Sequence, residues 1–249
     1  MEIPVRIVLV ETSHPGNIGA AARAMKTMGV TDLALVSPRY FPHEEATARA
    51  SGASAVLDNA SVCGTLDEAI GACEFVVGAS ARTRGMRWPV LDPRSAADQL
   101  RNRIPAVRCA LVFGPERSGL TNEDMARCHA LVHIPTAPDY GSLNLAMSVQ
   151  VLCYELRMAL ADARLAEPEH RDAPLATAAE LEGLHQHLES VLWSAKFLHP
   201  DHPNQLRMKL RRLFMRANLD QNEINILRGA LAALDPARVE TTSGGTAGE

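Results

Sequence analysis

The sequence has few aromatic residues, few cysteines and no long apolar run. Aromatic residues are 4% of its 249 residues. No apolar run approaches the roughly 18–20 residues that a membrane-spanning helix needs. The N-terminus lacks the basic and apolar regions of a secretory signal. These absences predict a cytoplasmic protein without a membrane partner. The apolar content of 47% excludes a mainly disordered chain.

The five cysteines are odd in number, widely spaced and never arranged as C-x-x-C. This pattern supports neither a disulfide framework nor a zinc site. We therefore expect buried, reduced thiols and no metal ion. The cysteines are Cys63, Cys73, Cys109, Cys128 and Cys153.

Positive charge is scarce overall but concentrated locally. The formal net charge is −4, which by itself gives no reason to expect a nucleic acid partner. However, residues 82–108 hold seven arginines against two aspartates, and residues 207–216 hold five cations and no acid. Each cluster is either a solvated surface or a surface that contacts phosphates.

Short apolar runs alternate with helical stretches in the first two thirds of the chain. This alternation predicts an α/β fold with a mostly parallel sheet. Asn17 is expected to cap a helix over 18–28 that ends at Gly29, and a long apolar helix is expected over 142–160. The predicted strands cover residues 5–10, 33–36, 75–78, 109–113 and 130–134.

Strand signals end before residue 164. A segment with two prolines and several charges then reads as a linker. Repeated leucine spacing predicts helices over 178–192, 202–217 and 221–234, which form a small all-helical module. The expected organisation is an α/β domain over 1–163, a linker over 164–176, a helical module over 177–235 and a flexible tail over 236–249.

The first unusual segment covers residues 17–26, directly after the first strand. Ligands of an open parallel sheet collect beyond the carboxyl ends of its strands. Gly16 and Gly19 flank a helix N-terminus that could bind an anion, and Arg23 shares a helix face with Lys26. The alternative is a solvated basic face. The glycine spacing fits neither a dinucleotide fingerprint nor a P-loop.

Three further segments follow later strands. Residues 78–84 combine small residues with Arg82 and Arg84. In residues 111–121, a capping box explains Thr121 and Asp124 but leaves Glu116 and Arg117 unexplained. In residues 134–146, Ser142 and Asn144 are either plain helix caps or parts of a polar pocket wall. No Ser/His/Asp or Cys/His set is present, and His133 is expected to be a core or edge histidine with its polar atoms satisfied.

Residues 17–26, 111–121 and 134–146 together resemble the three motifs of the SpoU (TrmH-like) branch of the SPOUT RNA methyltransferases. Residues 6–36, 66–92 and 210–217, with Leu227-Arg228-Gly229, further resemble the bacterial TrmJ family. That family consists of tRNA (cytidine/uridine-2′-O-)-methyltransferases acting at nucleotide 32 of the anticodon loop. The resemblance extends over residues 5–234.

The resemblance implies a cofactor, a topology and an assembly. The cofactor is S-adenosylmethionine. The sheet is expected to contain a C-terminal trefoil knot, and the protein is expected to form a homodimer through the knot region. Ala79 stands where relatives commonly carry threonine, and Pro115 lies within the motif of Glu116. The implied cofactor-binding residues are Ala79, Ser80, Ala81, Gly114, Ile134, Gly141, Ser142 and Leu143.

The resemblance also implies catalytic and RNA-binding residues. Arg23 is the expected central catalytic residue. A guanidinium has a pKa above about 12, so we expect Arg23 to hold a phosphate and stabilise the developing alkoxide, while the phosphate or a water accepts the proton. Asn17, Glu116, Ser142 and Asn144 are expected to orient Arg23 and the ribose. The expected tRNA-binding residues are Arg82, Arg84, Lys209, Arg211, Arg212 and Arg216.

Other functions remain open at this stage. The serious rival is a SpoU-type 2′-O-methyltransferase that acts on another tRNA position or on rRNA. A non-catalytic RNA-binding relative is disfavoured because the motif side chains Arg23, Glu116, Ser142 and Asn144 are all present. A nucleotide-binding metabolic enzyme is disfavoured because no dinucleotide fingerprint exists.

Overall fold

The computed structural model describes residues 2–81, 88–137, 139, 141, 143–161, 173–198 and 203–235. The chain forms two compact units, residues 1–170 and 171–249. Arg82, Arg84 and Ser142, most of the expected linker and the expected tail lie outside the described residues. Within them, no helix is both long enough and apolar enough to cross a bilayer.

The described part of the first unit is built on a seven-stranded sheet in the order β3-β2-β1-β6-β4-β7-β5. Every pairing is parallel, which confirms the predicted fold class. The two edge strands were not predicted, because runs of two or three residues carry no periodic signal. The strands are β1 (Val5–Val10), β2 (Leu33–Val36), β3 (Ser61–Cys63), β4 (Phe75–Ala79), β5 (Val90–Leu91), β6 (Cys109–Phe113) and β7 (Ala130–Val132).

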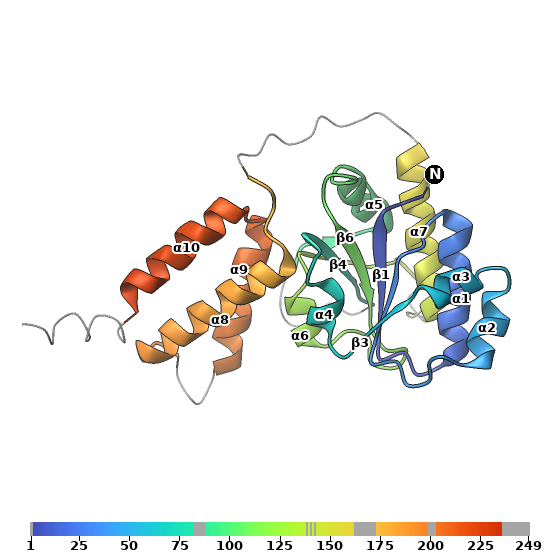
Figure 1. Cartoon of the computed structure of the whole chain (residues 1–249), viewed down its shortest axis with the longest axis horizontal. Helices are drawn as coiled ribbons and strands as arrows, with labels where there is room; N and C mark the ends of the chain where they lie inside the picture. The colour runs from blue at the N-terminus through green and yellow to red at the C-terminus, as the bar shows by residue number, and fades with distance from the viewer. Residues whose placement is uncertain are drawn as a thin grey trace, which may run out of the picture. The chain divides into compact units, whose positions relative to one another are not determined.

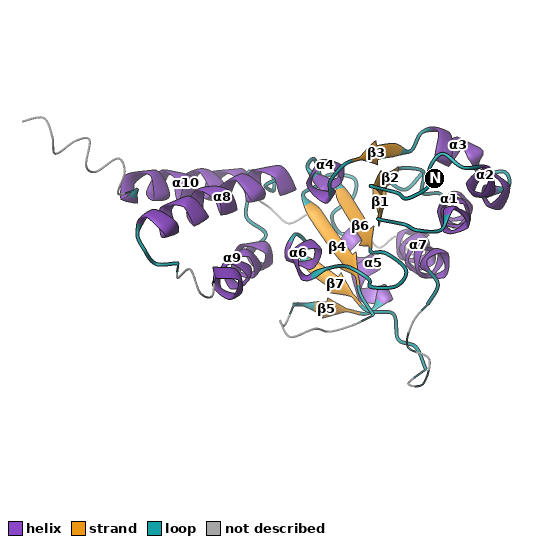
Figure 2. Ribbon diagram, turned by 90° about the horizontal axis from the view of Figure 1, so that it is seen from below, coloured by secondary structure: helices purple, strands orange, loops and turns teal. Residues whose placement is uncertain are grey.

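Helices cover both faces of the sheet (Figure 2). Helices α1, α5 and α7 lie on one face and share the main apolar core with the central strands. Helices α4 and α6 lie on the opposite face, and α2 and α3 pack outside α1 (Figure 1). The bounds are α1 Pro15–Met28, α2 Glu44–Ala50, α3 Ser54–Asp58, α4 Leu66–Ile70, α5 Pro93–Arg101, α6 Asn122–Ala126 and α7 Leu145–Ala161.

Helix α1 begins earlier than predicted, and the expected capping role of Asn17 is wrong. His14 is the N-cap residue and makes no capping hydrogen bond through its side chain. Pro15 starts the helix, since a proline loses nothing at a position where its missing N–H has no helical partner. The side chain of Asn17 is therefore free for a distant partner, which is described below.

The glycines of α1 serve packing. A Cβ on Gly19 would lie 2.0 Å from the carbonyl oxygen of Ala46 in α2, so only glycine lets the two helices approach this closely. A Cβ on Gly16 would lie 2.7 Å from a carboxylate oxygen of Glu45. A carboxylate so near the start of α1 disfavours a bound anion there. Gly16 and Gly19 therefore allow α1 to pack against α2, and the start of α1 is poorly suited to bind an anion.

The second unit contains helices α8 (Ala178–Ser194), α9 (Pro203–Ala217) and α10 (Gln221–Leu234). The predicted helices match these bounds within two residues. Capping boxes begin α8 at Thr177 and α10 at Asp220. Leu175, placed in the expected linker, pairs with Asp220 and belongs to this unit. Its core contains Ala176, Leu181, Leu184, Met215, Leu219 and Ile224.

Candidate functional site

A cavity of about 460 Å³ lies beyond the carboxyl ends of β4, β6 and β7. This volume is typical of a site for a small organic ligand, for which the range is about 300–1,000 Å³. The wall mixes apolar side chains with small residues that expose the backbone. Of the residues expected to bind cofactor, Ala79, Ser80, Ala81, Gly114, Ile134, Gly141 and Leu143 line the cavity.

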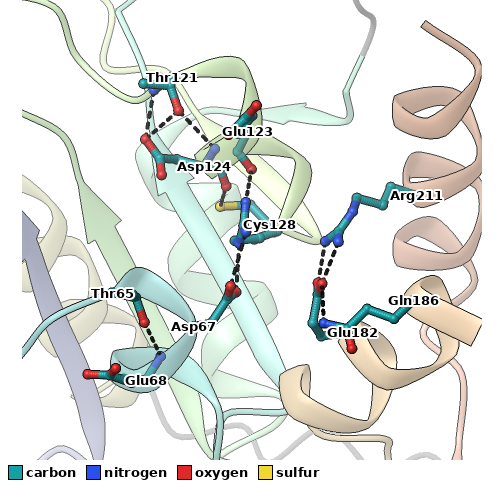
Figure 3. A network of polar contacts seen from close by, with 11 residues as sticks. Thr65, Asp67, Glu68, Thr121, Glu123, Asp124, Cys128, Glu182, Gln186 and Arg211 are labelled. Atoms are coloured by element: carbon teal, nitrogen blue, oxygen red, sulfur yellow. Dashed lines mark hydrogen bonds and ion pairs between the residues drawn. The ribbon is translucent and has the colours of Figure 1, made fainter. Parts of the chain in front are cut away.

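The loop after β6 closes one side of the cavity. The amide of Gly119 donates to the carbonyl of Pro115 at 2.8 Å, so the loop folds back on itself. A Cβ on Gly114 would lie 2.2 Å from the backbone nitrogen of Leu120, and only glycine fits there. The predicted capping box of Thr121 and Asp124 begins α6 directly after this loop (Figure 3).

Three polar side chains from the three motifs form one hydrogen-bonded chain at the cavity wall. Asn17 donates from Nδ2 to Oε1 of Glu116 at 2.9 Å. Asn144 donates from Nδ2 to Oδ1 of Asn17, also at 2.9 Å. Asn144 in turn accepts at Oδ1 from the amide of Ala146 at 2.9 Å, which caps α7. We call Glu116, Asn17 and Asn144 the amide relay.

The two ends of the amide relay determine how both amides are oriented. The carboxylate of Glu116 only accepts, so Asn17 must present its NH₂ group to it. The amide of Ala146 only donates, so Asn144 must present its oxygen there. These constraints leave the Asn17 oxygen facing the Asn144 NH₂ group, as observed. Each NH₂ group keeps a second N–H for a ligand.

Glu116 is a fixed, ionised carboxylate. Its Oε2 accepts from the amide and hydroxyl of Ser13, and its Oε1 also accepts from the amide of His14. Partial burial opposes ionisation, but the hydrogen bonds from Asn17 and Ser13 outweigh it and lower the pKa of Glu116. Glu116 therefore joins the loop before α1 to the loop after β6 and is poorly suited to accept a proton.

Arg23 does not lie in the cavity wall. It stands on the exposed side of α1, almost two turns beyond Asn17. Within the described part of the chain, no carboxylate pairs with its guanidinium. Its neighbour Lys26 is held by the carbonyl of Gly52 at 2.8 Å. Within a single chain, therefore, the expected catalytic arginine does not line the expected cofactor cavity.

The cavity also contains side chains that had no role assigned from the sequence. Arg117 is exposed and lines it beside Glu116. Motif position alone could have indicated Arg117, since it adjoins Glu116. Thr136, in the loop after β7, and Ser148, in the first turn of α7, carry no comparable signal. Each becomes a wall residue only when distant parts of the chain fold together. His133, expected in the core or at an edge, is half-buried, and its Nδ1 lies 3.2 Å from the carbonyl oxygen of Ser80.

The basic helix α9 of the second unit divides into paired and exposed cations. Arg211 forms a largely buried ion pair with Glu182 at 2.6 Å (Figure 3), and Arg207 pairs with Glu189 at 2.8 Å. Lys209 and Arg216 are exposed, whereas Arg212 is half-buried. The predicted RNA-binding role of Arg211 therefore competes with a structural one.

Within the described residues, no group of three or more histidine, cysteine, aspartate or glutamate side chains could hold a metal ion. All five cysteines are free. Burial raises the pKa of Cys128 and Cys153 to about 12, so these thiols stay protonated.

Comparison with known proteins places these features in a family. Residues 4–154 match the SpoU rRNA Methylase family, and residues 179–245 match the C-terminal domain of the tRNA methyltransferase TrmJ. A tRNA (cytidine/uridine-2′-O-)-methyltransferase TrmJ of Cronobacter sakazakii is 51% identical over 239 residues, which are 95% of this chain and 98% of the relative.

Solved structures give the same result. The crystal structure of TrmJ from Z. mobilis superposes with a TM-score of 0.82 at 35% identity, covering 93% of this chain and 99% of that one. An AdoMet-bound rRNA methyltransferase from Sinorhizobium meliloti superposes with a TM-score of 0.51 at 26% identity, over 64% of this chain and 58% of that one. These matches confirm the resemblance seen in the motifs.

Proposed function

The chain belongs to the SpoU methylase family and to its TrmJ branch, and we propose that it methylates the ribose 2′-oxygen of cytidine or uridine 32 in the tRNA anticodon loop. The methyl donor is S-adenosylmethionine. The observation that carries the proposal is the amide relay, which brings Glu116, Asn17 and Asn144 from three separate motifs to one cavity wall.

The cavity suits a nucleoside-like cofactor with a polar tail. Phe113, Leu120 and Ile134 offer apolar surface, while residues 79–81 and Gly114 let a ligand reach backbone groups. Ala79 lacks the hydroxyl that relatives commonly carry, which costs little where the contact is made by the main chain. S-adenosylmethionine supplies the electrophilic methyl group. The residues of this chain position the ribose and stabilise the oxygen that loses the 2′-hydroxyl proton.

Positioning and charge stabilisation carry the reaction, because a ribose hydroxyl is a weak nucleophile. The free N–H groups of Asn17 and Asn144 are held at fixed angles by Glu116 and can bind ribose oxygens. Arg23 stays cationic, so it holds the neighbouring phosphate and stabilises the developing alkoxide. The phosphate or a water accepts the proton. Ser142 contributes to ribose orientation beside Asn144.

A homodimer accounts for the position of Arg23. Met147, Tyr154 and Met158 recur at spacings of seven and four on α7, so they share one exposed apolar stripe. We propose that this stripe packs against a second copy through the knot region. The partner then brings its Arg23 to this cavity. The trefoil knot itself remains a prediction from the family.

We propose that the helical module holds the tRNA through Lys209, Arg212 and Arg216, together with Arg82 and Arg84 of the first unit. Lys209 and Arg216 are exposed on one helix and Arg212 is half-buried. Such cations suit the evenly spaced phosphates of an RNA arm. Arg211 supports the module through Glu182. All five cysteines are free, which fits a reducing, cytoplasmic location for this work.

Mass spectrometry of nucleosides tests the function. Unmodified tRNA is incubated with the full chain and S-adenosylmethionine, digested, and mapped for 2′-O-methyl nucleosides. We expect methylation at nucleotide 32 and none with Arg23→Ala, whose cofactor binding is checked by calorimetry. Methylation at another tRNA position, or only of rRNA added in parallel, would replace the proposed target. Near-normal turnover by Arg23→Ala would refute its catalytic role.

A further inference from the structure

The loop over residues 37–43, which joins β2 to α2, presents an aromatic surface that the proposed reaction does not use. Tyr40 is 49% exposed, although aromatic residues are only 4% of this chain. The guanidinium of Arg39 lies 5.4 Å from the centre of the Tyr40 ring. The ring of His43 lies 6.4 Å away at a tilt of 57°. We call Arg39, Tyr40 and His43 the Tyr40 platform.

The Tyr40 platform follows the carboxyl end of β2, so it lies at the same end of the parallel strands as the cavity. The amide of Arg39 donates to the carbonyl of Thr12 at 3.1 Å, and Thr12 directly precedes the serine that binds Glu116. On its other side, Ser37 donates from its hydroxyl to the carbonyl of Gly64 at 2.9 Å. Phe41 packs against the main core. An anchored loop can hold an exposed ring in place at little entropic cost.

We propose that the Tyr40 platform stacks an unpaired base of the RNA next to the methylated nucleotide. Single-stranded RNA loops are recognised by bases that stack on aromatic rings and on arginine planes. Tyr40 does not line the cavity, so the stacked base is a neighbour of the target and not the target itself. This inference rests on the proposed function, since it names how that substrate is held.

Local charge indicates that stacking, not phosphate attraction, dominates at this surface. Arg39 is opposed by Glu44 and Glu45 in the first turn of α2. Glu45 also lies 3.7 Å from the ring of His14. Residues 37–45, the loop with the first two residues of α2, therefore carry one arginine against two glutamates, a net charge of −1 with histidine neutral. A base–aromatic contact is largely insensitive to salt, whereas phosphate contacts release counterions and weaken steeply as salt rises.

The test measures binding of an anticodon stem-loop by the full chain, with 2-aminopurine placed in turn at each unpaired position. We expect fluorescence quenching at one or two positions with the native protein and loss of that quenching with Tyr40→Ala. The dissociation constant should rise roughly 5- to 150-fold, the range for one base–aromatic stack. The salt dependence of binding should stay unchanged, and Tyr40→Phe should bind like the native protein.

Arg49→Ala is the control for a loss of positive charge near this surface. It removes an exposed arginine in the last turn of α2, away from the Tyr40 platform. It should leave quenching intact. Binding by Tyr40→Ala within twofold of native would overturn the inference, as would dissociation of a dimer, which would make this surface a protein interface. Methyl transfer is scored separately. If the native protein binds and quenches RNA yet transfers no methyl group, the proposed function fails and the platform stands.

Discussion

His129 shows how one buried residue makes stability depend on pH. Its Nδ1 accepts from the amide of Val76 at 3.1 Å, and its ring lies 5.3 Å from that of Phe75. Arg103 covers the Phe75 ring at 3.9 Å. Burial, with a smaller contribution from the charge of Arg103, lowers the pKa of His129 from 6.5 to about 3. The folded protein therefore keeps this imidazole neutral.

Protonation of the unfolded chain then destabilises the fold as pH falls. The pKa of His129 is lower in the folded state, so below pH 6.5 the unfolded state binds a proton that the folded state does not. The free energy of unfolding should fall by up to about 1.4 kcal/mol per pH unit between pH 6 and pH 4 from this residue alone. His129→Gln keeps an acceptor for Val76 and should remove that part of the slope.

Tryptophan fluorescence can isolate this effect, because each unit holds one of the two tryptophans. Trp88 reports the first unit once Trp193→Phe silences the second. This separation matters since burial, mainly, also lowers the pKa of His185 in the helical unit, to about 4. Urea unfolding of Trp193→Phe, with and without His129→Gln, is measured at several pH values. The slope of the free energy of unfolding against pH is then compared between the two proteins. An unchanged slope in His129→Gln would refute the assignment.

At the residue scale, sequence indicates which side chains matter better than what they do. Asn17, Glu116 and Asn144 stand out because they follow strands of a parallel sheet. Their connection could not be predicted, since more than 90 residues separate Asn17 from either partner. Asn17 therefore looked like a local helix cap, the commonest use of an asparagine at such a position. Tertiary contact decided otherwise.

At the element scale, we expect substitution of two cations of α9, Arg211 and Lys209, to have different effects. Arg211→Ala removes the guanidinium from a largely buried ion pair and leaves Glu182 with the weaker hydrogen bond from Gln186. We expect a loss of about 2–3 kcal/mol in the free energy of unfolding. This is less than the roughly 3–5 kcal/mol for a fully buried pair, because about a fifth of each side chain is exposed. Lys209→Ala should leave stability unchanged, weaken tRNA binding, and reduce by about one the slope of log affinity against log salt.

Unfolding of the helical unit, followed through Trp193 in a Trp88→Phe background, measures the first effect. Filter binding of tRNA at several salt concentrations measures the second. If Lys209→Ala unfolds the module, or if Arg211→Ala changes only RNA affinity, the division between a structural and an RNA-facing cation is wrong. Glu182→Gln offers a check from the other side of the ion pair.

Helices were more predictable than strands because their signals are longer. The leucine spacing located α8, α9 and α10 within two residues. Edge strands β3 and β5 carry only three and two residues, too few for a periodic pattern. The close packing of α1 on α2 was also beyond the sequence: Gly19 looked like part of an anion site until Ala46 was found against it.

At the scale of the whole molecule, local pattern gives the class and not the path of the chain. Alternating strands and helices predicted a parallel sheet, which the structure confirms. A trefoil knot cannot be read from periodicity, because threading changes no hydrophobic pattern, and knots are rare enough that base rates argue against them. Only the family resemblance implies one. The same holds for the dimer, which the family implies and with which the exposed apolar stripe on α7 is consistent.

Mixing two inactive variants tests whether a second copy completes the site. Arg23→Ala lacks the arginine that we propose to be catalytic, and Glu116→Ala lacks the carboxylate that holds the amide relay. If Arg23 acts across a dimer, the heterodimer of these two chains has one site with both native residues. It should recover about half of the native activity, as two-fold symmetry requires. If Arg23 acts within its own chain, neither site is complete and the heterodimer is inactive.

Differently tagged chains, co-expressed and purified over both tags, give the pure heterodimer. Each homodimer must be shown by ultracentrifugation to remain a dimer, so that inactivity reflects the site and not the assembly. A heterodimer of the native chain with the doubly substituted chain is the control: it should be inactive if Arg23 acts across the interface, since each site then lacks one residue. The two models thus predict opposite results for this control heterodimer and for the heterodimer of single variants. Activity in the control would show that Arg23 acts on the cavity of its own chain.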